Sequence, residues 1–168
     1  VMRCTAAAKG GAVFSLSLDA PLVFETGIDG GDLFLNGVCP AHARRDRLVQ
    51  ADDAGRSGIR FQIRARVLAG GGSVSAGEGR ITVAGADSAV LLVGIRSDFA
   101  GWDRDPAGEF PAAACRADLD RAAAAGFDAL LAAHLAEYRS LYSRSSLELP
   151  ESPGDSLPTD ERLRNCRD

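Results

Sequence analysis

Side chains that could do chemistry are concentrated between residues 97 and 111. They are Asp98, Phe99, Trp102, Asp103, Asp105 and Glu109. Two acids that flank a glycosidic bond can protonate the leaving oxygen and activate a water molecule, and an aromatic ring beside them can bind a sugar. Asp and Gly also collect in loops because they favour turns. A turn-rich loop, a ligand or interface contact, and a catalytic acid pair therefore stay open as interpretations of this segment.

Basic side chains form two further clusters that could contact an anion. The polar segment 39–57 holds His42, Arg44, Arg45 and Arg47. Arg60, Arg64 and Arg66 alternate with apolar residues further along the chain. We expect both clusters to be solvated, because a basic run on a polar segment is generally surface, and an antiparallel sheet often leaves one face in water. A carboxylate or phosphate contact is the alternative.

The remaining candidates are one histidine and the cysteines. The cysteines are Cys4, Cys39, Cys115 and Cys166. They contain no CxxC pair of the kind that a structural zinc site uses, and they are too few and scattered for a disulfide scaffold, so we expect thiols in the core or at the surface. His134 lies on the apolar face of a predicted helix, and we expect it to be buried and hydrogen-bonded rather than catalytic. We therefore assign no catalytic, cofactor-binding or metal-binding residue.

The composition limits the classes of partner. The chain has 168 residues, of which 46% are hydrophobic and 25% charged, as in ordinary soluble domains. Its formal net charge of −4 does not favour a general nucleic-acid or anionic-membrane surface. The longest apolar run, residues 89–95, has the length of a strand and not of a membrane span. We expect neither a nucleic acid nor a membrane as partner.

The first hundred residues show the pattern of short strands. Strands are predicted over residues 1–5, 13–18, 22–26, 32–38, 59–68, 73–75, 80–83 and 89–96. Most alternate apolar and polar residues, whereas the run 89–96 is continuously apolar and is expected to be covered on both faces. Gly70, Gly71 and Gly72 are expected to form a hairpin turn. Short strands without helices between them indicate an antiparallel sandwich.

The last seventy residues are predicted to be helical. Residues 112–125 are rich in alanine, with Pro111 before them and Gly126 to end the helix. From Phe127 to Tyr142 apolar residues recur at the spacing of one helix face. A further helix begins at Thr159. The predicted fold class is mainly β, an antiparallel β-sandwich followed by two C-terminal linker helices.

Several motifs occur in a specific order along the chain. They are Gly58 to Phe61, Gly71 to Val74, Ile81 to Ser88, Ser97 to Phe99, Gly126 to Leu130, His134, Glu137-Tyr138, Leu141 to Arg144 and Leu157 to Leu163. Together they resemble glycoside hydrolases of family 95, mostly α-L-fucosidases, over about residues 1–163. The resemblance implies the later part of an N-terminal β-sandwich and a helical linker to an (α/α)6 catalytic barrel. The family's inverting mechanism uses a glutamic acid of that barrel, so no catalytic residue is carried over.

This resemblance implies four segments. Residues 1–98 are a portion of the sandwich, 99–111 a loop, 112–145 the linker helices, and 146–168 an extended linker and the start of the barrel. Both ends are expected to lie inside a longer chain, so the absence of a visible signal peptide leaves localisation open, with a secreted or periplasmic parent expected.

The implied function is that of a non-catalytic domain that supports the barrel. The implied partners are the catalytic barrel of the same enzyme and the parent's oligosaccharide, and the chain alone is expected to be inactive. Homodimers are one expected outcome of exposing the apolar faces of residues 89–95 and of the helix from Phe127. The alternatives are a free-standing carbohydrate-binding module that uses Trp102, and a small hydrolase that uses Asp98, Asp103 or Glu109.

Overall fold

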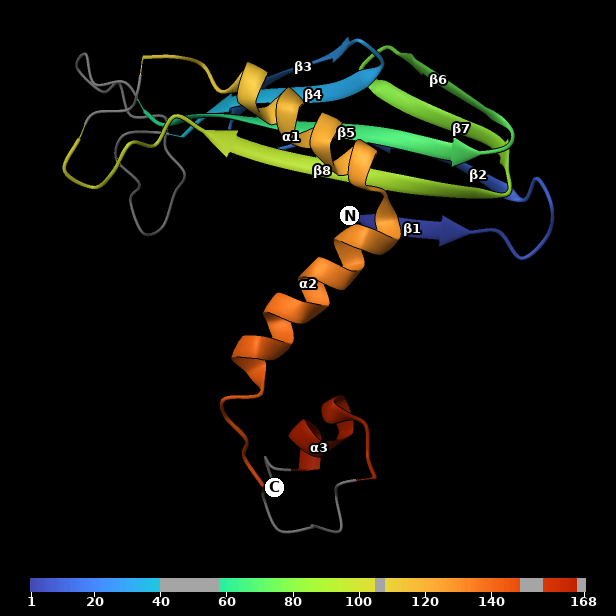
Figure 1. Cartoon of the computed structure of the whole chain (residues 1–168), viewed down its shortest axis with the longest axis vertical. Helices are drawn as coiled ribbons and strands as arrows, with labels where there is room; N and C mark the ends of the chain where they lie inside the picture. The colour runs from blue at the N-terminus through green and yellow to red at the C-terminus, as the bar shows by residue number, and fades with distance from the viewer. Residues whose placement is uncertain (40–57, 105–107, 149–155, 166–168) are drawn as a thin grey trace. The chain divides into compact units, whose positions relative to one another are not determined.

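The computed structural model describes residues 1–39, 58–104, 108–148 and 156–165. Its strands are β1 (Met2–Thr5), β2 (Ala12–Ser17), β3 (Val23–Asp29), β4 (Asp32–Val38), β5 (Arg60–Gly70), β6 (Ser73–Gly77), β7 (Arg80–Ala86) and β8 (Ser88–Ser97). Its helices are α1 (Ala112–Ala125), α2 (Phe127–Tyr142) and α3 (Thr159–Asn165) (Figure 1). The chain divides into two compact units, residues 1–132 and 133–168. The functional division into four segments stays a prediction.

The strands of the first unit form two antiparallel sheets. The larger sheet has the order β1-β8-β5-β4-β3, and the smaller has the order β2-β7-β6 (Figure 1). Neighbouring strands are antiparallel throughout, and the longest pairing runs from Phe61 opposite Ser97 to Gly70 opposite Ser88. The predicted class, a mainly β sandwich followed by C-terminal helices, is therefore confirmed.

The apolar core lies between the two sheets. Its buried members are Leu33, Val67, Ile81, Val83, Ala86 and Ala89. Successive side chains of a strand point to opposite faces, so the strands that line the core contribute residues of one face to this layer. Phe14 and Leu16 of β2 pack against the same cluster. The alternation of apolar and polar residues that predicted these strands therefore matches the alternation of buried and more exposed side chains.

The glycine turn after β5 connects the two sheets instead of closing a hairpin. β5 and β6 belong to different sheets, so the predicted hairpin is wrong. Gly71 and Gly72 have φ of 79° and 65°, a region in which residues with a Cβ are strained. A Cβ on Gly72 would also lie 2.4 Å from the Ala84 carbonyl oxygen. The two glycines therefore let the chain cross between the layers beside β7.

Helix α1 covers the outer face of the larger sheet and corrects a second prediction. It packs on β8 and β5, over the face that carries Arg60, Arg64 and Arg66 (Figure 1). Arg64 is buried, and Arg66 is largely covered. The expectation that this face is solvated is therefore wrong, because a helix that comes later in the sequence lies over it.

Strand β8 is not covered along its whole length, contrary to prediction. Ala89 and Leu92 are buried, whereas Val93 and Ile95 are 51% and 65% exposed. Val93 and Ile95 lie on the face that meets the smaller sheet, but the core between the sheets includes only Ala89 and Leu91 of this strand. The smaller sheet thus covers one end of the larger sheet and leaves an apolar strip at the other end.

Helix α2 begins in the first unit and continues into the second. Its bounds match the predicted amphipathic segment, but none of its residues is buried. His134 is exposed, so the prediction of a buried histidine is wrong. Its ring lies 6.0 Å from that of Tyr138, which stacks at 5.3 Å on Tyr142. In the described part of the chain, no helix is long and apolar enough to cross a membrane.

Candidate functional site

Asp98 of the acidic segment is a structural residue. Its side chain is fully buried and accepts hydrogen bonds from the Arg60 backbone N–H at 2.8 Å and the Arg60 Nε at 2.7 Å. The Asp98 N–H donates in turn to the Arg60 carbonyl oxygen at 3.0 Å. These bonds close the β5–β8 ladder where the strands end. The carboxylate is therefore buried and bonded to Arg60.

The other candidates of this segment point into solvent. Trp102 is 93% exposed, and Asp103 and Glu109 are exposed as well. Asp103 makes a loose ion pair with Arg104 at 4.0 Å. Asp105 lies outside the described residues. Asp98 is thus buried, whereas the other described acids of the segment are exposed. The structure gives no support to a catalytic pair among the described acids.

The charged layer between α1 and the larger sheet is centred on a buried arginine. The Arg64 guanidinium, 3% exposed, lies 3.3 Å from an Asp32 carboxylate oxygen and 2.9 Å from one of Asp29. Asp32 also accepts two hydrogen bonds from Arg66, at 2.6 and 2.8 Å. This fork geometry is the strongest form of an arginine–carboxylate contact. The buried charge of Arg64 is therefore compensated from β4 and from the end of β3.

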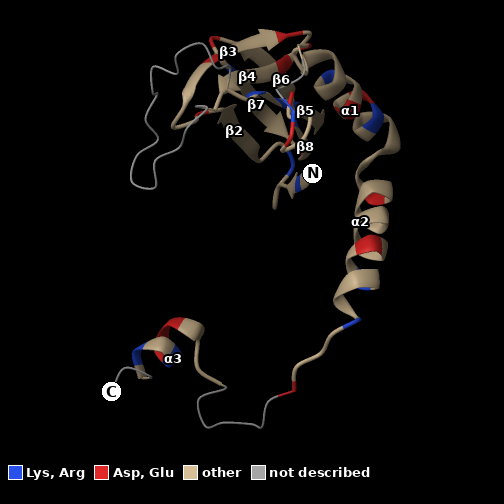
Figure 2. Ribbon diagram, turned by 90° about the vertical axis from the view of Figure 1, so that its left-hand side faces the viewer, with Lys and Arg blue, Asp and Glu red and all other residues tan. Residues whose placement is uncertain are grey.

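Helix α1 carries charged residues along its ribbon (Figure 2), and its side chains join this charged layer. Asp120 lies 2.9 Å from Arg66, and Arg116 bonds to Asp29. Asp118 pairs with Arg96 of β8, at 3.0 Å between Nη2 and Oδ1. These ion pairs connect the helix to three strands of the sheet or to their ends. The sequence prediction missed the acids, although acidic residues in the helix that follows an arginine-bearing strand are the signal that would have found them.

The pairing shifts the pKa of two carboxyls. Arg116, and then Arg64, lower the pKa of Asp29 from 3.8 to about 2 by hydrogen bonding to its carboxylate. Arg96 lowers the pKa of Asp118 in the same way. Opposite charges at hydrogen-bond distance favour the ionised form of both partners. Asp29 and Asp118 are therefore ionised at neutral pH.

Apolar contacts complete the attachment of α1. Cys115 and Leu119, one helical turn apart, are the buried residues of this helix. Both face Gly94 of β8, and a Cβ at that position would lie 2.5 Å from Leu119 Cδ1. Burial raises the pKa of the Cys115 thiol. Gly94 thus allows the close approach that seats the helix on the sheet.

A chain of side-chain hydrogen bonds continues across the sheet from Arg64. Its Nε donates to Gln62 Oε1 at 3.3 Å, and Gln62 Nε2 donates to Asn36 Oδ1 at 2.8 Å. Asn36 Nδ2 then donates to Glu25 Oε1 at 2.8 Å. Within the described ranges, no buried side-chain nitrogen or oxygen lacks a partner. The buried polar groups of this face are therefore paired within the protein.

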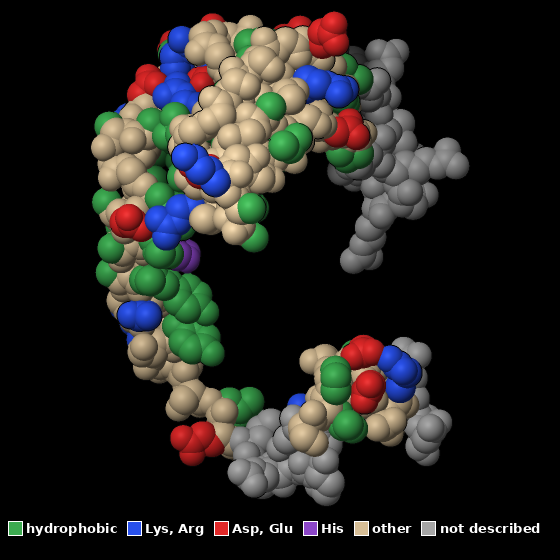
Figure 3. All heavy atoms as spheres, turned by 90° about the vertical axis from the view of Figure 1, so that its right-hand side faces the viewer, with side chains coloured by type: hydrophobic (Ala, Val, Ile, Leu, Met, Phe, Trp, Pro, Cys, Tyr) green, Lys and Arg blue, Asp and Glu red, His purple; other side chains and the backbone are tan. Residues whose placement is uncertain are grey.

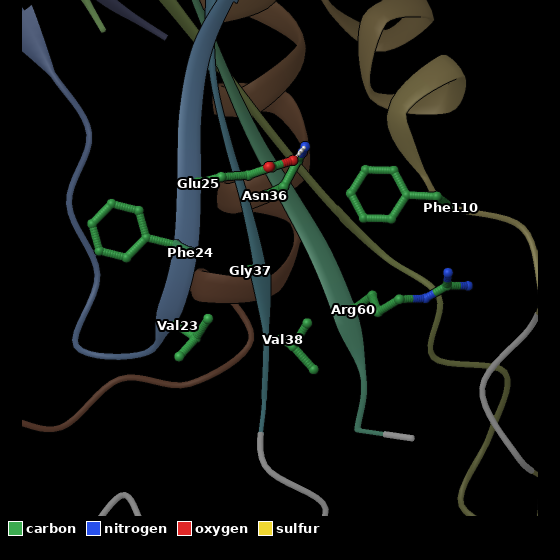
Figure 4. A pocket seen from close by; sticks show the side chains of 8 residues that line it. All are labelled: Val23, Phe24, Glu25, Asn36, Gly37, Val38, Arg60 and Phe110. Atoms are coloured by element: carbon green, nitrogen blue, oxygen red, sulfur yellow. Dashed lines mark hydrogen bonds between the residues drawn. The ribbon is translucent and has the colours of Figure 1, made fainter. Parts of the chain in front are cut away.

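A groove opens where this polar chain reaches the edge of the sheet. It has a volume of about 400 Å³ and lies beside Val23, Glu25, Asn36, Val38, Arg60 and Phe110. Figure 4 shows the Phe110 ring on one side and the hydrogen-bonded Glu25–Asn36 pair opposite it, with Val23 and Val38 beyond them. The Arg60 guanidinium donates to the Gly108 carbonyl oxygen at 2.9 Å as well as to Asp98. The groove therefore combines an aromatic wall with fixed polar groups.

The other candidates are basic residues, a histidine and the cysteines. His42, Arg44, Arg45 and Arg47 lie outside the described residues, as does Cys166. The thiols of Cys4, Cys39 and Cys115 are free. Over the ranges that the structure describes, no three His, Cys, Asp or Glu side chains are grouped so that they could hold a metal ion.

Two apolar surfaces of the described residues are exposed. One is the strip of β8 that carries Val93 and Ile95, in the first unit. The other is the apolar face of α2, which includes Tyr138, Leu141 and Tyr142 of the second unit and along which hydrophobic side chains gather (Figure 3). Contiguous apolar surface is characteristic of interaction sites. Each unit therefore carries a surface that could meet a partner.

Comparison with known proteins identifies the family. A search of the curated proteins found no match. The sequence model described as "Glycosyl hydrolase family 65, N-terminal domain" matches residues 1–102, which include both sheets and the start of the acidic segment. This description supports a glycoside hydrolase N-terminal domain, although it names family 65 where the sequence motifs resemble family 95. The chain thus belongs to the glycosyl hydrolase family 65 N-terminal domain family.

Proposed function

We propose that this chain is the non-catalytic N-terminal region of an α-L-fucosidase-like glycoside hydrolase. It would support an (α/α)6 barrel that hydrolyses terminal α-L-fucosyl or α-L-galactosyl linkages by inversion. The family match over residues 1–102 carries the proposal. The resemblance of the motif order to family 95 supplies the fucosidase part.

The state of the charged side chains supports a structural role. An inverting glycosidase needs two carboxyl groups that reach the scissile bond and a water molecule. Asp98 is buried against Arg60, and Asp32 is buried between Arg64 and Arg66. These buried acids form ion pairs with arginines. The charged layer therefore serves to fix α1 on the sheet. A firmly held helix can then position the segment that comes after it in the sequence.

The exposed apolar faces support a partner in the parent enzyme. We infer that the catalytic barrel covers the apolar face of α2 and the strip at Val93 and Ile95. An uncovered face of this kind favours self-association in the isolated chain. A homodimer formed through the same faces is therefore expected when the barrel is absent.

The intact mass of the native gene product tests this proposal. A mass several times the 17.5 kDa of the chain, together with hydrolysis of 4-nitrophenyl α-L-fucoside, is expected. The chain alone should not hydrolyse this substrate. A native product near 17.5 kDa would overturn the proposal.

A carbohydrate-binding module is the second candidate, because Trp102 is 93% exposed. Exposed tryptophan rings bind sugars through their faces. Under this alternative Trp102→Ala abolishes glycan binding by the chain, whereas under the first proposal the same change leaves glycan binding untouched.

A further inference from the structure

We propose that the groove beside Phe110 binds a neutral sugar ring. The choice of a sugar over other neutral polyols rests on the proposed function. The site lies within the first unit, on the side of the larger sheet that carries α1, and none of the described acids of the 97–111 segment lines it. It would give the domain a carbohydrate contact of its own.

The size of the groove suits such a ligand. Its volume of about 400 Å³ is at the lower end of the range of small-molecule sites, roughly 300–1,000 Å³. Val23 and Val38 provide apolar surface next to the polar pair. A mostly apolar wall with a few fixed polar groups is the usual composition of a binding pocket.

The two sides of the groove match the two kinds of surface that a sugar presents. The Phe110 ring and the Glu25–Asn36 pair lie on two sides of the groove (Figure 4). A pyranose ring has an apolar face of C–H groups, which packs on an aromatic ring, and hydroxyl groups at its edge. An ionised carboxylate only accepts hydrogen bonds, so Glu25 selects a ligand that donates them. Hydroxyl groups of a sugar meet this requirement.

The polar pair is held in place before any ligand binds. Gln62 is buried and donates to Asn36 at 2.8 Å, and Asn36 donates to Glu25 at 2.8 Å. Groups that are already oriented lose little conformational entropy on binding. The hydrogen-bond chain that begins at Arg64 therefore aims the exposed carboxylate of Glu25 at the groove.

The charges indicate that the ligand is neutral. Among the described residues that line the groove, Arg60 is the cation, and its guanidinium already binds the Asp98 carboxylate and the Gly108 carbonyl oxygen. The exposed carboxylate of Glu25 repels anions. A phosphate or a uronic acid would therefore be disfavoured relative to an uncharged hexose.

Titration of the full chain with L-fucose, followed by backbone amide chemical shifts, tests the proposal. Saturable shifts are expected in β3 and β4 with a dissociation constant in the millimolar range, and D-glucuronate should bind more weakly. Phe110→Ala should weaken L-fucose binding at least tenfold. Phe99→Ala is the matched control, since Phe99 is an exposed phenylalanine of the same segment and does not line the groove.

Glu25→Gln gives a second test that does not depend on Phe110. The amide oxygen can still accept from Asn36, but the negative charge is lost, so the preference for L-fucose over D-glucuronate should shrink. Absence of saturable shifts, or binding that Trp102→Ala removes and Phe110→Ala does not, would overturn the proposal. Neither result affects the proposed function, which fails on the mass of the native product.

Discussion

The two long helices of this chain differ in what holds them. α1 is rich in alanine and carries few large apolar residues, yet it is attached to the sheet by Leu119, by Cys115 and by a layer of ion pairs. α2 has the regular apolar face that normally indicates burial, yet none of its residues is buried. An amphipathic pattern thus shows that a helix has an apolar face. It does not show that other residues of the same chain pack on that face.

The difference also concerns stability. The 16 residues of α2 only slightly exceed the length of about 12–15 residues below which an isolated helix is marginal in water. α1 has two buried side chains and charge partners on three strands or their ends, so its stability comes from the sheet. We expect α1 to unfold with the sandwich and α2 to fray independently.

The largest effect should come from removing the buried carboxylate of the charged layer. Asp32→Ala leaves Arg64 and Arg66 without their shared partner, and breaking a buried ion pair costs about 3–5 kcal/mol in the free energy of unfolding. Urea unfolding measures this loss. Asp120→Ala is the control, because Asp120 is an exposed partner of Arg66 alone and should cost less than about 1 kcal/mol. Equal losses would show that burial of the layer contributes nothing.

A leucine in each helix gives the next comparison. Leu119→Ala removes a buried side chain of α1 and should cost about 3 kcal/mol. Leu141→Ala acts on an exposed residue of α2 and should change the free energy of unfolding by less than about 0.5 kcal/mol. Thermal and urea unfolding measure both variants. A comparable loss for Leu141→Ala would mean that α2 is packed in the isolated chain.

The pH dependence should report on the ion pairs of α1. The pKa of Asp29 is about 2 in the folded chain against an ordinary 3.8, so the folded state binds fewer protons than the unfolded state in this range. The stabilisation is complete above the unfolded value and is lost as the pH falls from about 4 towards 2. Urea midpoints measured from about pH 5 to pH 2.5 should therefore fall, and fall less in Asp29→Asn. Identical slopes in the two proteins would refute this contribution.

The exposed apolar faces should affect association more than stability. Ile95→Ser and Leu141→Ser each replace an exposed side chain, so the urea midpoint should move little. Sedimentation at increasing concentration should show less self-association in both variants than in the parent chain. If neither variant changes the self-association, these faces do not mediate self-association of the isolated chain.

The positions of the strands and helices could be predicted from the local pattern of apolar and polar residues. Alternation along residues 59–68 predicted β5, and the alanine-rich segment that ends at Gly126 predicted α1. These features depend on residues that are close in sequence. The glycine-rich turn after β5 was misread, because the same residues can close a hairpin or carry the chain to another sheet.

The burial of the polar face of the larger sheet depends on contacts between residues that are far apart in the sequence. The local sequence pattern does not predict such contacts. Arg64 meets Asp32, which is 32 positions away in sequence, and Asp29 meets Arg116, which is 87 positions away. Likewise, the apolar spacing around His134 predicted a face but not its exposure. The acidic segment was recognised as a candidate, but only the fold shows that Asp98 is bound to Arg60.

Hydrogen exchange of the two helices tests the central claim most directly. It would be measured on the monomeric chain and on the native gene product. We predict that α1 amides are protected in both, whereas α2 amides exchange rapidly in the isolated chain and are protected in the native product. α2 amides as protected as those of α1 in the isolated monomer, or unprotected in the native product, would contradict the account.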